Sequence, residues 1–189
     1  MLSTFRTFVG YMKVCIFCSA NNSLDAEFFA MTEELGRWAA QQGHVIVYGG
    51  VSSGLMECVA KAAVLAGGRT VGVVPDIVEQ GGRVSAWNSE VVRCSNLTER
   101  KQLMLDMSDV FIALPGGVGT LDEVFTVAAS YTIGYHRKRV VLYNMKGFWD
   151  GAVAMLDDLA AKGVIRGRWR DYIAVADSLG EIASFLNEK

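Results

Sequence analysis

Short apolar runs alternate with longer stretches of helical periodicity along most of the chain. Continuous apolar runs between amphipathic stretches are typical of strands that are buried on both faces of a parallel sheet. The runs predict strands at residues 13–17, 45–48, 70–74, 90–93, 110–114, 139–143 and 172–175. The intervening stretches predict helices at residues 26–42, 55–66, 97–107, 121–134, 149–162 and 179–187.

The order of these elements predicts the fold class. Strands that alternate with helices favour an α/β fold, a Rossmann-like three-layer sandwich with a parallel sheet flanked by helices. In such a fold the ligand crevice is expected at the carboxyl ends of the strands. Capping patterns support two helix starts, Asn-Leu-Thr-Glu at 96–99 and Ser-Leu-Gly-Glu at 178–181.

Length and composition indicate one globular domain. The chain has 189 residues, of which 51% are hydrophobic and 20% are charged, so a single packed core is expected. We predict this domain over residues 13–189. Residues 1–12 are interpreted as an N-terminal extension, either disordered or left by an upstream start, because Met12 directly precedes the first predicted strand.

Charge and hydropathy argue against nucleic-acid and membrane partners. The net charge is −2 and no block of lysine or arginine stands out, whereas general nucleic-acid binding needs a basic face. The apolar runs have roughly 5–7 residues, far fewer than the ~20 needed to span a bilayer. Residues 1–11 lack a long apolar core and a convincing cleavage site, so we expect no secretory signal and a cytoplasmic protein.

The four cysteines are interpreted as buried, reduced thiols. Cys15 and Cys18 form a lone C-x-x-C, and positions three apart on a strand face opposite sides, which makes shared metal ligation awkward. No cluster of histidine and cysteine completes a zinc or redox site around them. We therefore expect no metal.

The most informative segment is Pro-Gly-Gly-Val-Gly-Thr-Leu-Asp-Glu at 115–123. It lies between a predicted strand and a predicted helix, where glycines let backbone N–H groups approach an anion and the helix start adds partial positive charge. A carboxylate in a loop that only held phosphate would repel the anion, so Glu123 is expected to face another part of the ligand. The segment predicts a site that grips a phosphate and places a carboxylate near the rest of a nucleotide.

The pattern Pro-Gly-Gly-x-Gly-Thr-x-x-Glu at 115–123 resembles the signature of the LOG family. These are the cytokinin riboside 5'-monophosphate phosphoribohydrolases, long mislabelled as lysine decarboxylases. The resemblance runs from about residue 13 to the C-terminus and includes Tyr-Gly-Gly at 48–50, Gly-Leu-Met at 54–56 and Glu-Arg-Lys at 99–101. It implies a nucleotide-binding domain and hydrolysis of the N-glycosidic bond of AMP or N6-substituted nucleotides to free base and ribose 5-phosphate.

The resemblance also implies two catalytic residues, Glu123 and Arg100. The matching Glu lies near the ribose and the scissile bond, where a carboxylate stabilises an oxocarbenium-like cation or activates the attacking water. The matching Arg would bind phosphate or stabilise the departing base. A purely structural role remains open for both residues. Thr-Leu-Asp-Glu at 120–123 fits a helix capping box, and Arg100 fits a solvent-exposed helix face.

The remaining candidates are substrate-binding residues near the carboxyl ends of predicted strands. They are Ser19, Gly49, Gly50, Met56, Lys101, Pro115, Gly116, Gly117, Gly119 and Thr120. The glycines of the 115–123 segment and Thr120 would hold the phosphate, and the glycine-rich turn at 48–56 is a second element that could hold a nucleotide through backbone amides. The sequence shows no metal cluster and no cofactor fingerprint, so we expect neither. The resemblance implies a nucleoside monophosphate as the small-molecule partner and a homodimer.

The chain departs from the family pattern at three places that bear on substrate fit and base preference. Val51 and Glu57 stand where the family usually has glycines, and Tyr131 stands in a region that usually has tryptophan. His136, close by, is interpreted as structural.

Three other functions have weaker support. A non-catalytic nucleotide or molybdenum-cofactor carrier would share the fold and the glycine loops, although the presence of both Arg100 and Glu123 favours an enzyme. Gly-Val-Ser-Ser-Gly at 50–54 fits the nucleophile elbow of esterases, but that elbow normally follows several strands and here follows one. A lysine decarboxylase needs a Schiff-base lysine and partners for pyridoxal phosphate, and no lysine has that sequence context.

Overall fold

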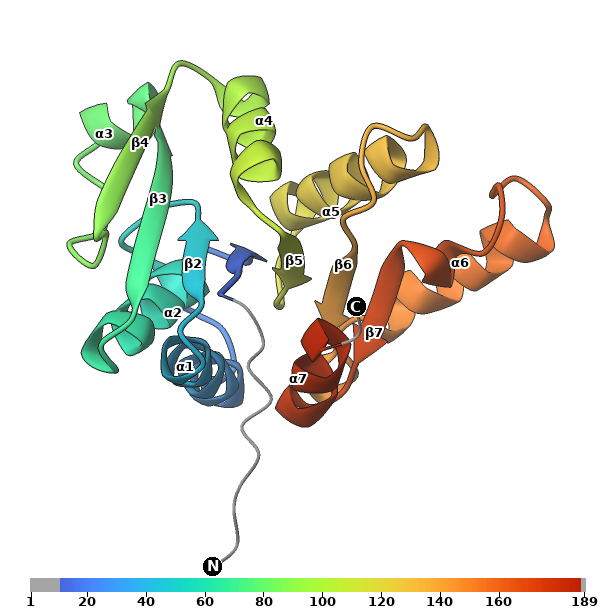
Figure 1. The fold of residues 1–189 in the computed structure, drawn as a ribbon, viewed down its shortest axis with the longest axis horizontal. Helices are drawn as coiled ribbons and strands as arrows, with labels where there is room; N and C mark the ends of the chain where they lie inside the picture. Colours follow the sequence, from blue (N-terminus) through green and yellow to red (C-terminus); the bar gives the residue numbers. More distant parts are fainter. Residues whose placement is uncertain (1–10, 188–189) are drawn as a thin grey trace, which may run out of the picture.

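The apolar runs form a seven-stranded sheet in the computed structural model of the protein, which describes residues 11–187 (Figure 1). The strands are β1 (Lys13–Phe17), β2 (Val45–Tyr48), β3 (Arg69–Pro75), β4 (Glu90–Cys94), β5 (Val110–Ala113), β6 (Val140–Tyr143) and β7 (Ile173–Ala176). All pairings between them are parallel, in the order β4-β3-β2-β1-β5-β6-β7. The predicted strands and the α/β fold class are confirmed, with strand ends within one residue.

Seven helices are found in the same residues. They are α1 (Ala26–Gln41), α2 (Gly54–Leu65), α3 (Asp76–Gln80), α4 (Leu97–Met107), α5 (Val118–Thr132), α6 (Asp150–Ala161) and α7 (Leu179–Asn187). Both predicted caps are confirmed, because Glu99 N donates to Asn96 Oδ1 at 2.9 Å and Glu181 N donates to Ser178 Oγ at 3.2 Å. The short helix α3 was missed, since five residues are too few to show helical periodicity.

The sheet separates two apolar cores. Side chains alternate along each strand, so Ile46 joins the core under α1, α2 and α7, and Val47 joins the core under α4, α5 and α6 (Figure 1). Cys15 and Cys18 lie in different cores, as the strand geometry predicts, and burial raises the pKa of both thiols well above their usual value. This places both thiols in apolar packing.

The strand order reverses direction beside β1. Strands β2 to β4 continue on one side of β1, and β5 to β7 continue on the other side. The loops that leave β1 and β5 are held together, since Ser19 N donates to the Pro115 carbonyl at 3.0 Å and Leu114 N donates to the Phe17 carbonyl at 2.9 Å. This switch point is where open α/β sheets form ligand crevices.

The expected N-terminal extension, residues 1–12, lies outside the described residues except for its last two. Within the described part, the Met12 carbonyl accepts a hydrogen bond from Val45 N at 2.9 Å. Among the helices of residues 11–187, none combines the length and the apolar character needed to cross a membrane.

Candidate active site

A cavity of about 250 Å³ opens at the carboxyl ends of β1 and β5. It is lined by Cys18, Ser19, Ala20, Met56, Arg100, Gly117, Gly119, Thr120 and Glu123. The loops after β1 and β5 and the helices α2, α4 and α5 each contribute to this lining. The fold therefore brings both candidate catalytic residues and five of the candidate binding residues around one space.

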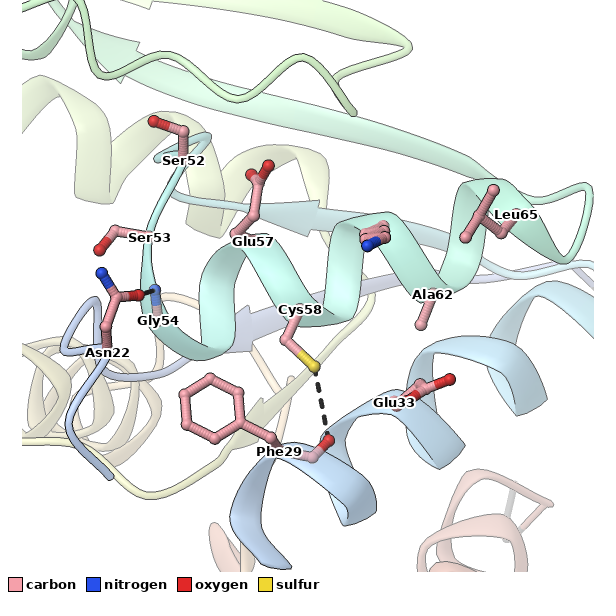
Figure 2. A pocket seen from close by; sticks show the side chains of 11 residues that line it. Asn22, Phe29, Glu33, Ser52, Ser53, Gly54, Glu57, Cys58, Ala62 and Leu65 are labelled. Carbon is pink, nitrogen blue, oxygen red and sulfur yellow. Dashed lines mark hydrogen bonds between the residues drawn. The ribbon is translucent and has the colours of Figure 1, made fainter. Parts of the chain in front are cut away.

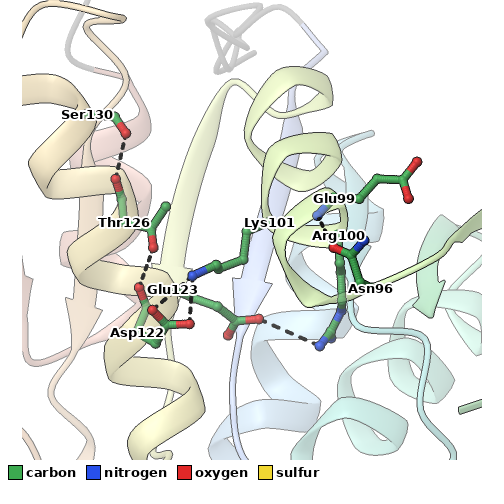
Figure 3. A network of polar contacts seen from close by, with 8 residues as sticks. All are labelled: Asn96, Glu99, Arg100, Lys101, Asp122, Glu123, Thr126 and Ser130. Carbon is green, nitrogen blue, oxygen red and sulfur yellow. Dashed lines mark hydrogen bonds and ion pairs between the residues drawn. The ribbon is translucent and has the colours of Figure 1, made fainter. Parts of the chain in front are cut away.

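Glu123 and Arg100 face each other inside this cavity (Figure 3). Glu123 Oε1 lies 4.0 Å from Arg100 Nη1, and the two side chains are only 10% and 11% exposed. Burial raises the pKa of Glu123 to about 7, even though the Arg100 guanidinium acts to lower it. A carboxyl with this pKa exchanges its proton readily near neutral pH, which suits a general base or acid.

The capping-box interpretation of Glu123 is wrong. Helix α5 begins at Val118, directly after Gly117, so Thr120 lies inside the first turn and makes no side-chain cap. A Cβ atom on Gly116 would collide with the Thr120 hydroxyl, which shows how closely the loop packs on this side chain. Because Thr120 is no N-cap residue, Glu123 has no capping partner and its carboxylate faces the cavity.

The start of α5 offers backbone amides to the cavity. The first N–H groups of a helix have no partner four residues back, and here neither a cap nor an acidic side chain in the first turn meets them. The start of α2 differs, because Gly54 N donates to Asn22 Oδ1 at 2.8 Å and Leu55 N donates to the Ser19 carbonyl at 2.9 Å. Of the two helix starts, that of α5 therefore offers the better anion site, because the first two amides of α2 already have partners.

The backbone of β3 and of the turn after β2 packs against Arg100. Its Nε donates to the Val73 carbonyl at 3.2 Å, and a Cβ atom on Gly49 would collide with its Nη2. Among the described residues Nη2 is buried without a hydrogen-bond partner. Gly49 thus makes room for the guanidinium, and a buried donor is left for an acceptor that the fold itself does not supply.

Comparison with known proteins decides the family. A family described as "Possible lysine decarboxylase" matches residues 56–186. The cytokinin riboside 5'-monophosphate phosphoribohydrolase of Mycobacterium tuberculosis is 35% identical over 170 residues, which cover 90% of each chain. A probable enzyme of the same name from Oryza sativa subsp. japonica is 34% identical, over 94% of this chain and 72% of its own length. The chain belongs to the LOG family.

Solved structures similar to this LOG-family chain include proteins described as carriers. The molybdenum cofactor carrier protein of Chlamydomonas reinhardtii has a TM-score of 0.73 at 23% identity, over 95% of this chain and all of its own. The molybdenum cofactor binding protein of Rippkaea orientalis has a TM-score of 0.71 at 22% identity, over 94% of this chain and 96% of its own. At such identities the likeness shows the fold alone.

Several residues of the LOG motifs do not line the cavity. Lys101 Nζ contacts both carboxylate oxygens of Asp122, at 2.9 and 2.8 Å (Figure 3). Gly50 has φ +70° and packs against Gly72, so it shapes the turn after β2. Pro115 and Gly116 form the turn before the start of α5 and likewise do not line the cavity.

Two residues that do line the cavity, Cys18 and Ala20, were missed among the predicted site residues. Both are direct neighbours of Ser19 in the chain, and this adjacency is the signal that could have indicated them.

The departures from the LOG pattern lie away from the Arg100–Glu123 pair. Val51 forms an isolated antiparallel bridge with Val84. Glu57 lines a different cavity of about 360 Å³, over α1 and α2, together with residues such as Asn22 and Cys58 (Figure 2). Neither Val51 nor Glu57 lines the cavity that holds the catalytic candidates.

The other sequence hypotheses find little support in the geometry. The Ser52 hydroxyl donates to the Arg83 carbonyl at 3.1 Å and not to a histidine, and His136 Nδ1 accepts from Lys138 N at 3.1 Å. The cavity around Glu123 is lined by no lysine. Across residues 11–187, no group of three or more histidine, cysteine or acidic side chains is placed to hold a metal ion.

Proposed function

We propose that the protein hydrolyses the N-glycosidic bond of purine nucleoside 5'-monophosphates to free base and ribose 5-phosphate. The observation that carries this proposal is the buried Arg100–Glu123 pair in the same cavity as the uncapped start of α5. The names of the LOG-family relatives support the same activity. AMP and N6-substituted, cytokinin-type nucleotides are the proposed substrates.

The phosphate of the substrate is assigned to the start of α5. Gly117 and Gly119 line the cavity there, and they place no side chain between the helix amides and an anion. Glu123 follows one helical turn after Gly119, a rise of roughly 5–6 Å along the axis. This spacing supports the assignment of the carboxylate to the ribose of a 5'-nucleotide whose phosphate is bound at the helix start.

The proposed chemistry is a hydrolysis with Glu123 as its base. The electron pair of the bond between the ribose C1' and the base leaves with the base, and positive charge develops on the ribose. The Glu123 carboxylate stabilises that charge and takes a proton from the water whose oxygen attacks C1'. The departing base takes up one proton, either from Glu123 or from solvent, so the products are neutral free base and ribose 5-phosphate. Arg100 keeps its own proton and binds the phosphate or the departing base through its free buried N–H.

The test is release of free base from nucleotides of graded structure. Purified protein is incubated with AMP, isopentenyl-AMP and adenosine, and the products are separated by chromatography. We expect free base and ribose 5-phosphate from the nucleotides and little from adenosine, because adenosine lacks the phosphate that the start of α5 binds. Faster release from isopentenyl-AMP than from AMP would establish the cytokinin preference.

The carrier interpretation predicts the opposite outcome for the same samples. A carrier would bind AMP, for example in calorimetry, and would release no base from any of the compounds. Tight binding without turnover by folded protein would therefore overturn the proposed hydrolysis.

A further inference from the structure

A second cavity, with a basic lining, lies at the opposite end of α5 from the Gly117 loop. Its volume is about 230 Å³, and its lining comes from the end of α5, the segment after it and the loop that joins α6 to β7. Its lining includes Tyr131, Arg137, Arg166, Arg168, Asp171 and Tyr172. None of these residues lines the cavity of Glu123.

The topology brings the two basic segments together. Arg137 precedes β6 and Arg166 precedes β7, and these two strands are neighbours in the sheet with parallel register. Their entry loops therefore meet at the amino ends of the strands, the edge opposite the Arg100–Glu123 pair. Because 29 positions separate the two arginines, no local motif in the sequence indicates the cluster.

Two of the three arginines lack an acidic partner. Arg168 Nη2 pairs with Asp171 Oδ1 at 2.9 Å, which neutralises one positive charge. Among residues 11–187, neither Arg137 nor Arg166 forms an ion pair with a carboxylate. The cavity thus carries an excess of positive charge, in a chain whose net charge is −2.

Aromatic side chains hold part of this lining in place. The Arg137 guanidinium lies 5.3 Å from the centre of the Tyr131 ring, and the Tyr131 ring lies 5.6 Å from that of the buried Tyr172. The carbonyls of residues 129–131 at the end of α5 already accept hydrogen bonds from the amides of residues 133–135. The arginines, and not the end of the helix, therefore set the charge preference of the cavity.

We propose that this cavity is a second ligand site, which binds the phosphate group of a small molecule. A guanidinium presents a planar set of N–H donors that matches phosphate oxygens, and two arginines without acidic partners line this one cavity. The volume is below the roughly 300–1,000 Å³ of pockets that enclose a whole drug-sized ligand. The phosphate enters the cavity, and the rest of the molecule extends along its open side.

The test is a titration of the full chain, followed through its backbone amide resonances by NMR. The probes are inorganic phosphate, AMP and a single-stranded oligonucleotide. The first two distinguish a bare phosphate from one carried on a nucleoside, and AMP is titrated into proteins that also carry Glu123→Gln so that it is not hydrolysed. The test variant is Arg137→Gln/Arg166→Gln. The control is Arg37→Gln/Arg83→Gln, which removes the same charge from exposed arginines that do not line this cavity.

We expect saturable shifts at residues 131–137 and 166–172 with phosphate or AMP, and binding at least about tenfold weaker in the test variant but unchanged in the control. Shifts at residues 117–120 would persist in both variants, so failure of this site is separable from failure of the catalytic one. No saturable shift at the second site with either small probe would overturn the proposal. A response to the oligonucleotide alone would also overturn it, because it would show a general basic surface.

Discussion

At the scale of single residues, the proposed chemistry depends on how Glu123 is buried. The side chain is 10% exposed and its nearest charged partner, Arg100, lies 4.0 Å away, a distance that does not neutralise the cost of burial. The pKa of Glu123 is therefore raised to about 7 instead of being lowered by the ion pair. Two measurable consequences follow from this one carboxyl.

The first consequence concerns the pH dependence of turnover. If Glu123 acts as a base, it must be ionised, so kcat/KM for AMP should rise with pH and level off above about 7. Initial rates measured between pH 5.5 and 8.5 would show this limb. A profile that is flat over the range, or that falls as the pH increases, would contradict the assignment of Glu123 as the base.

The second consequence concerns stability. The folded protein favours the protonated form of Glu123, so the stability contributed by this group is fully present below its ordinary pKa of 4.5 and is lost as the pH rises to about 7. Glu123→Gln removes that loss and should stabilise the protein at pH 8 by up to a few kcal/mol, with little effect near pH 4.5. Thermal unfolding of both proteins at the two pH values measures the effect. A stability difference independent of pH would argue against a raised pKa.

At the scale of elements, the turn after β2 makes room for Arg100, the second proposed catalytic residue. Gly49→Ala should leave the fold intact, since its Cβ meets the far end of a flexible side chain, but it should displace the Arg100 guanidinium. We expect kcat/KM to fall at least about tenfold, through loss of a charge-assisted hydrogen bond. Gly151→Ala, whose Cβ meets open space on α6, is the matched control and should keep full activity. Equal activity of the two variants would contradict the role of Gly49 in positioning Arg100.

The start of α5 makes a different prediction. A Cβ on Gly119 meets no protein atom within 4 Å, so Gly119→Ala fits the fold and should stabilise the helix by up to ~1 kcal/mol. The same methyl group enters the proposed phosphate site, so KM for AMP should rise. Paired measurements of unfolding and of KM check both effects. A more stable variant with unchanged KM would move the phosphate site elsewhere.

The elements themselves were predictable from sequence, and the reasons are local. Strands such as β2 (Val45–Tyr48) are continuous apolar runs, and α4 (Leu97–Met107) carries its own cap. The helix predicted at residues 121–134 begins three residues after the observed start of α5 at Val118. Gly117 and Gly119 have low helix propensity, so the sequence of the first turn does not indicate a helix. The capping-box hypothesis for Glu123 failed for the same reason.

The candidate site was predictable only in part, because some partners come from distant segments. The contact of Arg100 with the Gly49 turn and the pairing of Lys101 with Asp122 join residues more than 20 positions apart. No periodicity or spacing specifies such contacts. The motifs indicated which residues gather at the crevice, and packing determines which of them face it.

At the scale of the whole molecule, the remaining expectation is a homodimer. Ile77, Leu97 and Val118 are 61–84% exposed and lie at the starts of α3, α4 and α5, which all follow the carboxyl ends of strands. These three helix starts lie at the carboxyl ends of the strands, and we propose that they form the dimer interface. We expect a solution mass of twice the chain mass by light scattering.

A charge placed at that interface should weaken the dimer. Val118→Asp should shift the mass toward that of one chain at low concentration, and Leu65→Asp, on a side chain 67% exposed on α2, should not. A protein that is monomeric at all concentrations would contradict the homodimer, and a larger effect of Leu65→Asp would place the interface elsewhere.

The central claim is that Glu123 acts on the ribosyl bond, and the most direct test is the rate of free-base release from AMP by two neighbouring variants. Glu123→Gln should lower that rate by roughly 10²–10⁴-fold, the usual effect of removing a general base. Asp122→Asn makes the same chemical change one residue away, on an exposed side chain paired with Lys101, and should stay within a few-fold of the parent rate. Base release by folded Glu123→Gln at the parent rate would contradict the account.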